Sequence, residues 1–133
     1  DVRCALEELG ASLAAERIDE EGKRNLKRAL IAFEKAIELG DTAEIADKDM
    51  DFHDVIFDIV DNPRLTSIVN NLREQIYRYR LEYVKDFDYH DTLLREHRQI
   101  TEAIFHHNSE KAQKIMKAHI YNQEITVIRN IKE

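Results

Sequence analysis

Apolar residues recur along this chain at intervals of three and four, which is the period of an α-helix with one buried face. A clear example is the series Leu26, Leu30, Phe33 and Ile37. The 133 residues include only three glycines and one proline, so few positions favour the turns that separate short strands. The pattern therefore predicts an all-α fold built from long helices.

Residues that cap or break helices divide the chain into six predicted helices. Gly40 suits the position after a helix, Pro63 suits the first turn of one, and Asn108 with Ser109 can cap the last. The predicted helices cover residues 1–17, 19–40, 42–60, 63–85, 90–107 and 109–133. The short connections predict antiparallel neighbours in a six-helix bundle that forms one domain over residues 1–133.

Composition and charge narrow the classes of function. Hydrophobic residues make up 43% and charged residues 35% of the chain, as in ordinary globular proteins. A net charge of −7 argues against direct contact with DNA, because phosphate binding needs clustered Lys and Arg. No apolar run approaches the roughly 20 residues that cross a bilayer, so no membrane partner is expected. The single cysteine, Cys4, cannot form an internal disulfide, which favours the reducing cytoplasm.

Four polar side chains fall on the apolar faces of three different predicted helices. Asp49 and His53 lie four residues apart on the apolar face of the third helix, one turn above the other. His97 interrupts the apolar face of the fifth helix, and His119 that of the sixth. An inward carboxylate is costly unless something compensates its charge. The four residues therefore point to a common cause.

A shared divalent metal would account for all four. Two ligands spaced by four residues on one helix can grip an ion, and single histidines on two packed helices can complete the set. We expect Zn²⁺ first, with Ni²⁺ or Mn²⁺ as alternatives. Three neutral imidazoles and one carboxylate leave such an ion with residual positive charge. A small carboxylate with an adjacent hydroxyl or keto oxygen would suit any open coordination position.

Several alternatives to a metal-dependent sensor stay open from these residues alone. An Asp–His pair at this spacing is commonly a surface ion pair, and a lone inward His is commonly bonded to a backbone carbonyl. With a metal present, the domain can also be a metal-dependent helical-bundle enzyme, a domain with a purely structural metal, or a sensor of the metal itself. The enzyme would need a general base, and we expect no Glu on these apolar faces. No nucleotide-binding loop, zinc-finger Cys pair or His-Glu-x-x-His motif is present.

Several short sequence pieces occur in a fixed order along the chain. They are R-x-x-L-E at 3–7, Leu13-Ala14-Ala15, D-x-x-x-H at 49–53, Asn62-Pro63-x-Leu65, Glu96-His97 and Met116-x-x-His119. In this order they resemble the FCD domain, the effector-binding C-terminal domain of the FadR subfamily of GntR-type transcription regulators. The resemblance covers nearly the whole chain.

The resemblance implies a fold, a metal site and partners. Family members form antiparallel bundles of six or seven helices around a central metal and ligand pocket, and six here suggests the shorter, VanR-like form. The metal ligands of the family map onto Asp49, His53, His97 and His119. The implied effector is a small organic acid, the implied assembly is a homodimer, and no enzymatic activity is expected. DNA would be bound by an N-terminal winged helix-turn-helix absent from this chain, which begins without Met inside a predicted helix.

The effector-binding residues are expected beside the metal. Arg3 matches a first-helix arginine that faces the ligand pocket in several family members, and a guanidinium can hold a carboxylate through two hydrogen bonds. The alternative is a surface ion pair between Arg3 and Glu7. Tyr79, Arg80 and Tyr83 are further candidates for the pocket lining, with packing or a subunit interface as their alternative.

Overall fold

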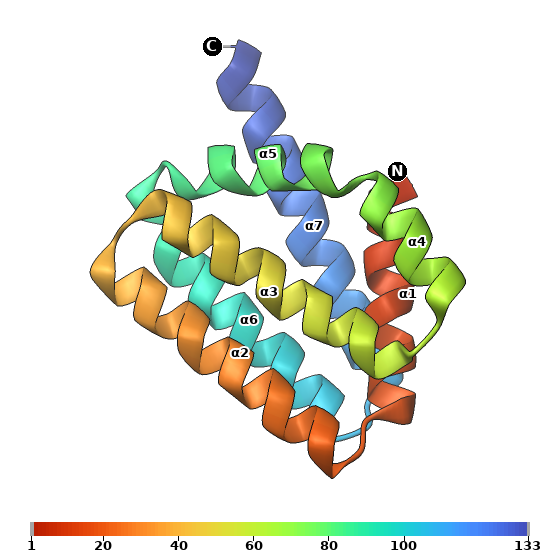
Figure 1. The fold of residues 1–133 in the computed structure, drawn as a ribbon. Coiled ribbons are helices and arrows are strands. Elements are labelled where there is room, and N and C mark those ends of the chain that lie inside the picture. The colour runs from red at the N-terminus through yellow and green to blue at the C-terminus, as the bar shows by residue number, and fades with distance from the viewer. Residues whose placement is uncertain (1, 133) are drawn as a thin grey trace.

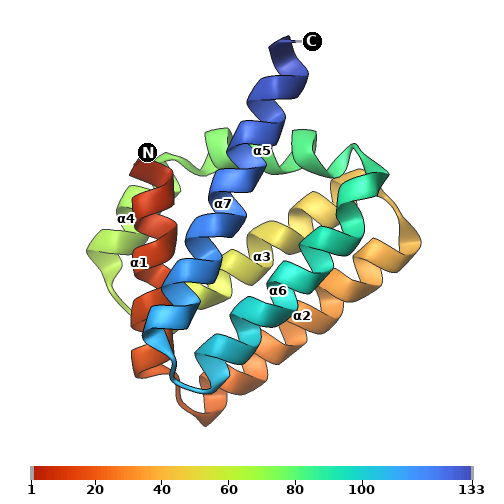
Figure 2. The same cartoon turned by 180° about the vertical axis from the view of Figure 1, so that it is seen from behind.

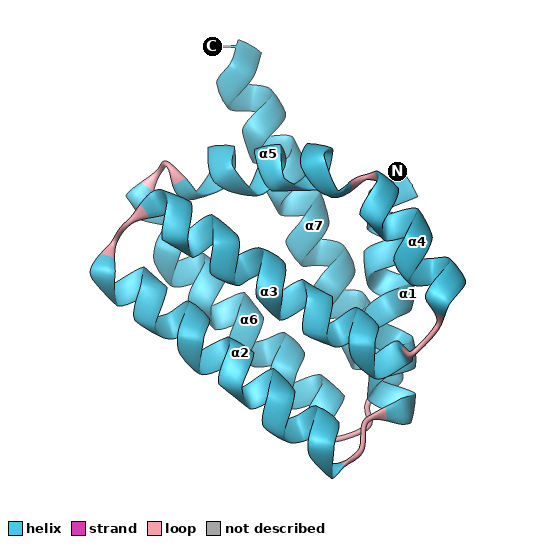
Figure 3. Ribbon diagram, in the orientation of Figure 1, coloured by secondary structure: helices cyan, strands magenta, loops and turns pink. Residues whose placement is uncertain are grey.

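The computed structural model describes residues 2–132, with side chains described for residues 2–130. This part of the chain is all-α, as predicted, and no strand occurs in it (Figure 3). The helices are α1 (Val2–Arg17), α2 (Glu20–Leu39), α3 (Thr42–Val60), α4 (Pro63–Asn71), α5 (Arg73–Val84), α6 (His90–Phe105) and α7 (Ser109–Lys132), with a short 3-10 turn, η1 (Phe87–Tyr89). Among the described helices, none combines the length and apolar character needed to cross a membrane.

Capping residues fix most helix boundaries where the sequence predicts them. The Asp19 carboxylate accepts a hydrogen bond from the Gly22 backbone N–H at 2.8 Å and so caps α2. Asp41 caps α3 and Asn62 caps α4 in the same way. Gly40 ends α2 with a φ of 74°, a left-handed conformation that glycine adopts without strain.

One predicted helix is wrong, because residues 63–85 form two helices. Leu72 has φ −101° and ψ 1°, and its backbone N–H bonds to the Val69 carbonyl three residues back instead of continuing the α-helical pattern. The preceding residues, Asn70 and Asn71, are poor helix formers. The chain turns here, so that α4 lies beside α1 while α5 crosses the end of the bundle (Figure 1). The bundle has seven helices in the described residues, not six.

The helices pack in two sets around the interior. Helices α2, α3 and α6 run side by side, and α1 and α7 form a closely packed antiparallel pair beside them (Figures 1 and 2). Helix α7 also packs on α5 and α6, and its C-terminal turns continue past α5. Helices α3, α6 and α7 therefore surround a shared central region.

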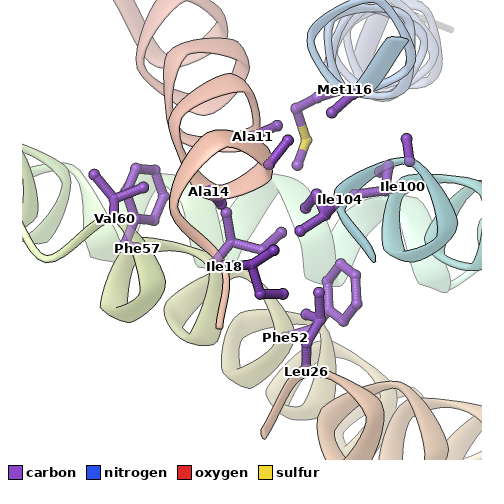
Figure 4. Packing of buried hydrophobic residues seen from close by; sticks show 14 of the residues in the cluster. Ala11, Ala14, Ile18, Leu26, Phe52, Phe57, Val60, Ile100, Ile104 and Met116 are labelled. Atoms are coloured by element: carbon purple, nitrogen blue, oxygen red, sulfur yellow. The ribbon is translucent and has the colours of Figure 1, made fainter. Parts of the chain in front are cut away.

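Apolar side chains from these helices fill the core on both sides of that region. Figure 4 shows Phe52 of α3, Ile100 and Ile104 of α6 and Met116 of α7 directed toward one another. A second cluster contains Phe33, Ala36, Ile45, Ala46, Tyr83, Val84, Leu93 and Val127. His97 lies between these two apolar clusters, with Phe33 of the second at 4.0 Å and Phe52 of the first at 4.6 Å between ring centroids.

Candidate metal centre

The four polar residues on the apolar faces meet in the middle of the bundle. Asp49 and His53 come from α3, His97 from α6 and His119 from α7. Each offers one ligand atom, and the four atoms all lie within 4.8 Å of one another. The residues are 0%, 2%, 0% and 1% exposed, respectively. Because Asp49 and His53 are buried, the alternative of a surface ion pair between them is wrong.

His97 is held by oxygen atoms at both ring nitrogens. Its Nδ1 lies 2.7 Å from the Leu93 carbonyl oxygen and its Nε2 lies 2.8 Å from Asp49 Oδ1. A neutral imidazole donates through one nitrogen only. With the Nδ1–H donated to Leu93, the Nε2 lone pair faces the Asp49 carboxylate. Either a proton or a metal cation between Nε2 and the carboxylate satisfies both groups. Phe33 stacks on the ring at 4.0 Å between centroids and fixes its plane.

His119 directs one ring nitrogen toward the centre. Its Nδ1 donates to Glu96 Oε1 at 3.1 Å, which leaves Nε2 as an acceptor. Nε2 is buried and has no hydrogen-bond partner among the described residues. Burial lowers the pKa of His119, so the ring favours the neutral form that a metal requires.

His53 lies between two carboxylates. Its Nδ1 is 2.6 Å from Glu7 Oε2 and its Nε2 is 3.3 Å from Asp49 Oδ1, but neither contact is aligned as a hydrogen bond. Asp49 Oδ2 also has no hydrogen-bond partner among the described residues, and its nearest cationic group is Arg80 Nε at 3.9 Å. Unpartnered buried atoms of this kind each cost about 1–3 kcal/mol. They are the oxygen and nitrogen atoms with which a divalent metal bonds, so the residues fit such an ion.

The buried acids stay ionised. Burial by itself would raise the pKa of Asp49, but His97, whose Nε2 lies 2.8 Å from Asp49 Oδ1, holds that pKa well below its usual range. Burial would likewise raise the pKa of Glu7, and the charges of His53 and Arg80 hold it well below its usual range. The centre therefore combines anionic oxygens with imidazoles, a donor set suited to a borderline cation such as Zn²⁺.

Arg80 and Arg3 extend this polar region toward α5, α1 and α7. Arg80 is 1% exposed, and its NH2 donates to Glu7 Oε2 at 3.2 Å. Arg3 is 7% exposed, and its NH2 donates to Gln123 Oε1 at 2.6 Å. Arg3 and Glu7 are both buried and bind different partners, so the alternative of a surface ion pair between them is wrong.

The two tyrosines predicted to line the pocket lie in different places. The Tyr79 ring is 5.8 Å from Arg3 Cζ. The two residues help line a pocket of about 360 Å³ between α1, α5 and α7. Tyr83 instead packs in the second apolar cluster and stacks on Tyr89 at 4.9 Å between ring centroids. Burial raises the pKa of Tyr83 to about 12. The structure thus brings Arg80 to the candidate centre, where its Nε lies 3.9 Å from Asp49 Oδ2. Arg3 and Tyr79 line a separate pocket that contains none of the four candidate ligands.

Sequence reasoning missed three buried residues of this region. The expectation that no Glu lies on the three apolar faces is wrong for α6, because Glu96 is buried there and contacts His119. Glu7, which contacts His53, comes from α1. The third residue is Gln123, which is 0% exposed. Two signals were present in the sequence: Glu7 precedes the buried Ala11 by one helical turn, and Gln123 follows His119 by one turn.

Comparison with known proteins agrees with this architecture. The model of the FCD domain family matches residues 1–122. The chain is also 31% identical over 134 residues to the "Uncharacterized HTH-type transcriptional regulator YdhC" of Bacillus subtilis (strain 168). That match covers 99% of this chain and 59% of the relative, so the chain spans less than two thirds of the relative's length. This chain belongs to the FCD domain family.

Proposed function

We propose that this chain is the ligand-sensing domain of a GntR/FadR-type transcription regulator and that it holds a divalent metal on Asp49, His53, His97 and His119. The observation that carries the proposal is the convergence of these four ligand atoms within 4.8 Å in the buried centre of an FCD domain. We propose Zn²⁺ as the ion, with Ni²⁺ or Mn²⁺ as alternatives. A bound ion supplies positive charge and coordination positions for an oxygen ligand.

We further propose that a small carboxylate effector binds between the metal and Arg3. Arg3 Nε and NH1 and Gln123 Nε2 are buried donors without a hydrogen-bond partner among the described residues. Burial and the charge of Arg80 lower the pKa of Arg3 to about 10, although Glu124 Oε1 lies 3.7 Å from Arg3 NH1. An anion rich in acceptor oxygens would satisfy these donors, and Arg3 also lines the pocket of about 360 Å³ beside Tyr79.

Effector binding would act by shifting the population of bundle packings. The metal ligands join α3, α6 and α7, while Arg3 and Gln123 join α1 to α7. A ligand that contacts both groups favours the packing in which they are close, to the extent that it binds that packing more tightly. In the proposed regulator, a homodimer of such domains transmits the change to separate N-terminal DNA-binding domains.

Titration calorimetry of the zinc-loaded chain with hydroxy-acids, keto-acids and simple carboxylates tests the proposal. We expect at least one acid to bind the loaded chain and to bind much more weakly after chelation. If metal removal lowers the melting temperature but no acid in a broad panel binds, the ion is purely structural and the sensing role is wrong. Metal-dependent conversion of an acid to product would instead support an enzyme.

A further inference from the structure

Two buried carboxylates outside the proposed ligand set face two of the proposed ligand histidines. Glu7 Oε2 of α1 lies 2.6 Å from His53 Nδ1 in an ion-pair contact that is not aligned as a hydrogen bond. Glu96 Oε1 of α6 accepts a hydrogen bond from His119 Nδ1 at 3.1 Å. The two glutamates are 2% and 8% exposed. Each carboxylate therefore contacts the ring nitrogen opposite the one that faces the centre.

The placement matters because an imidazole has two non-equivalent nitrogens. A neutral ring binds a metal through its unprotonated nitrogen, and an acceptor at the other nitrogen decides which one carries the proton. Such an acceptor also orients the ring and strengthens it as a ligand. The Leu93 carbonyl has this position at His97 Nδ1. All three rings thus have an oxygen at Nδ1.

We propose that Glu7 and Glu96 are positioning residues of the metal centre. Glu96 accepts the Nδ1 proton of His119, and the Glu7 carboxylate beside His53 Nδ1 favours the proton on that nitrogen, so that the Nε2 lone pair of each ring is free for the ion. This inference rests on the proposed metal site. Glu7 accepts a hydrogen bond from Arg80 NH2 at 3.2 Å and contacts His53, so it connects the ligand helix α3 to both α1 and α5.

Glu7 has a competing role as the counter-ion of buried Arg80. In that role its loss would leave an uncompensated buried charge and lower stability, without a specific effect on the metal. The two roles separate in a double variant, E7Q/R80Q, which removes both charges together. Glu96 offers an independent comparison, because it accepts from His119 and makes no hydrogen bond or ion pair with Arg80 among the described contacts.

The test compares Zn²⁺ affinity, by competition with a chromogenic chelator, in the wild-type chain and in E7Q, E96Q, E7Q/R80Q and E8Q. Glu8 is the matched control, since its side chain contacts Gln113 and Cys4 and none of the four proposed ligands. We expect E7Q, E96Q and E7Q/R80Q each to bind Zn²⁺ about 10- to 100-fold more weakly. E8Q should bind like the wild type. Absorption spectra of the Co²⁺-loaded chains should change in the same three variants.

The outcomes distinguish failure of the metal site from failure of the positioning role. If the wild-type chain itself binds no Zn²⁺ or Co²⁺, the proposed metal site fails. If it binds, but E96Q and E7Q/R80Q keep the wild-type affinity and Co²⁺ spectrum, the positioning role is overturned and Glu7 is only the counter-ion of Arg80. Should E7Q alone fail to fold, the double variant and E96Q give the same decision.

Discussion

Replacement of His97 by Ala should remove the dependence of thermal stability on metal. His97 is fully buried, and Phe33, Leu93 and Asp49 contact its ring, so no other His can take its place. A metal present at 1,000 times its dissociation constant stabilises the folded state by about 4 kcal/mol. For a chain of 133 residues, this corresponds to a shift in melting temperature of roughly 15 °C.

Differential scanning calorimetry with and without a chelator measures this shift. The wild-type chain should lose roughly 15 °C on chelation under those conditions, whereas H97A should melt at nearly the same temperature with and without metal. H106A is the matched control, because His106 is exposed at the end of α6 and should leave the full metal dependence intact. An H97A chain that responds to chelation as strongly as the wild type would refute the assignment of His97 as a ligand.

Three further results are expected. Arg3→Met should leave Zn²⁺ affinity within about threefold of the wild-type value but weaken binding of the carboxylate effector at least tenfold in calorimetric titrations. The reason is that a charge-assisted hydrogen bond to a buried Arg contributes about 1.5–3 kcal/mol. If the variant binds the acid as tightly as the wild type, Arg3 is not part of the effector site. Zn²⁺ affinity should fall as the pH is lowered, since protons compete with the ion for His53, whose pKa is raised beside the carboxylates of Glu7 and Asp49. Equilibrium competition at several pH values would show a flat profile if carboxylates alone held the ion. Gly10→Ala should lower the free energy of unfolding by about 1–3 kcal/mol through overpacking, since the added Cβ would lie 2.7 Å from the Phe57 ring. Urea unfolding measures this change. An unchanged urea midpoint would contradict the close packing of α1 on α3 at this position.

The sequence predicted most of the fold because its boundaries depend on local chemistry. Gly40 at the end of α2 and Pro63 at the start of α4 act through their own backbone preferences, so these boundaries could be recognised without the tertiary structure. The break at Leu72 has no proline or glycine to mark it. It follows from the packing of α4 beside α1 and of α5 across the bundle, which local preferences do not encode.

The candidate site was predictable to the extent that polar residues stood on apolar faces. Asp49, His53, His97 and His119 interrupt such faces, and their burial was therefore expected. Glu7 was missed because a partner of opposite charge, Arg3, lies one turn away in the same helix and suggested a surface pair. In the folded chain Arg3 instead bonds to Gln123 of α7, and Glu7 accepts from Arg80 of α5. These partners are distant in sequence, so local spacing did not predict them.

Metal-edge anomalous scattering from crystals of the Zn²⁺-loaded chain would locate the proposed ion itself. We expect one strong peak per chain in the middle of the bundle, at about 2.0–2.2 Å from an Asp49 carboxylate oxygen and from the Nε2 atoms of His53, His97 and His119. No peak in the bundle, or a peak bonded to surface residues with these four side chains still paired to one another, would contradict the proposed metal centre.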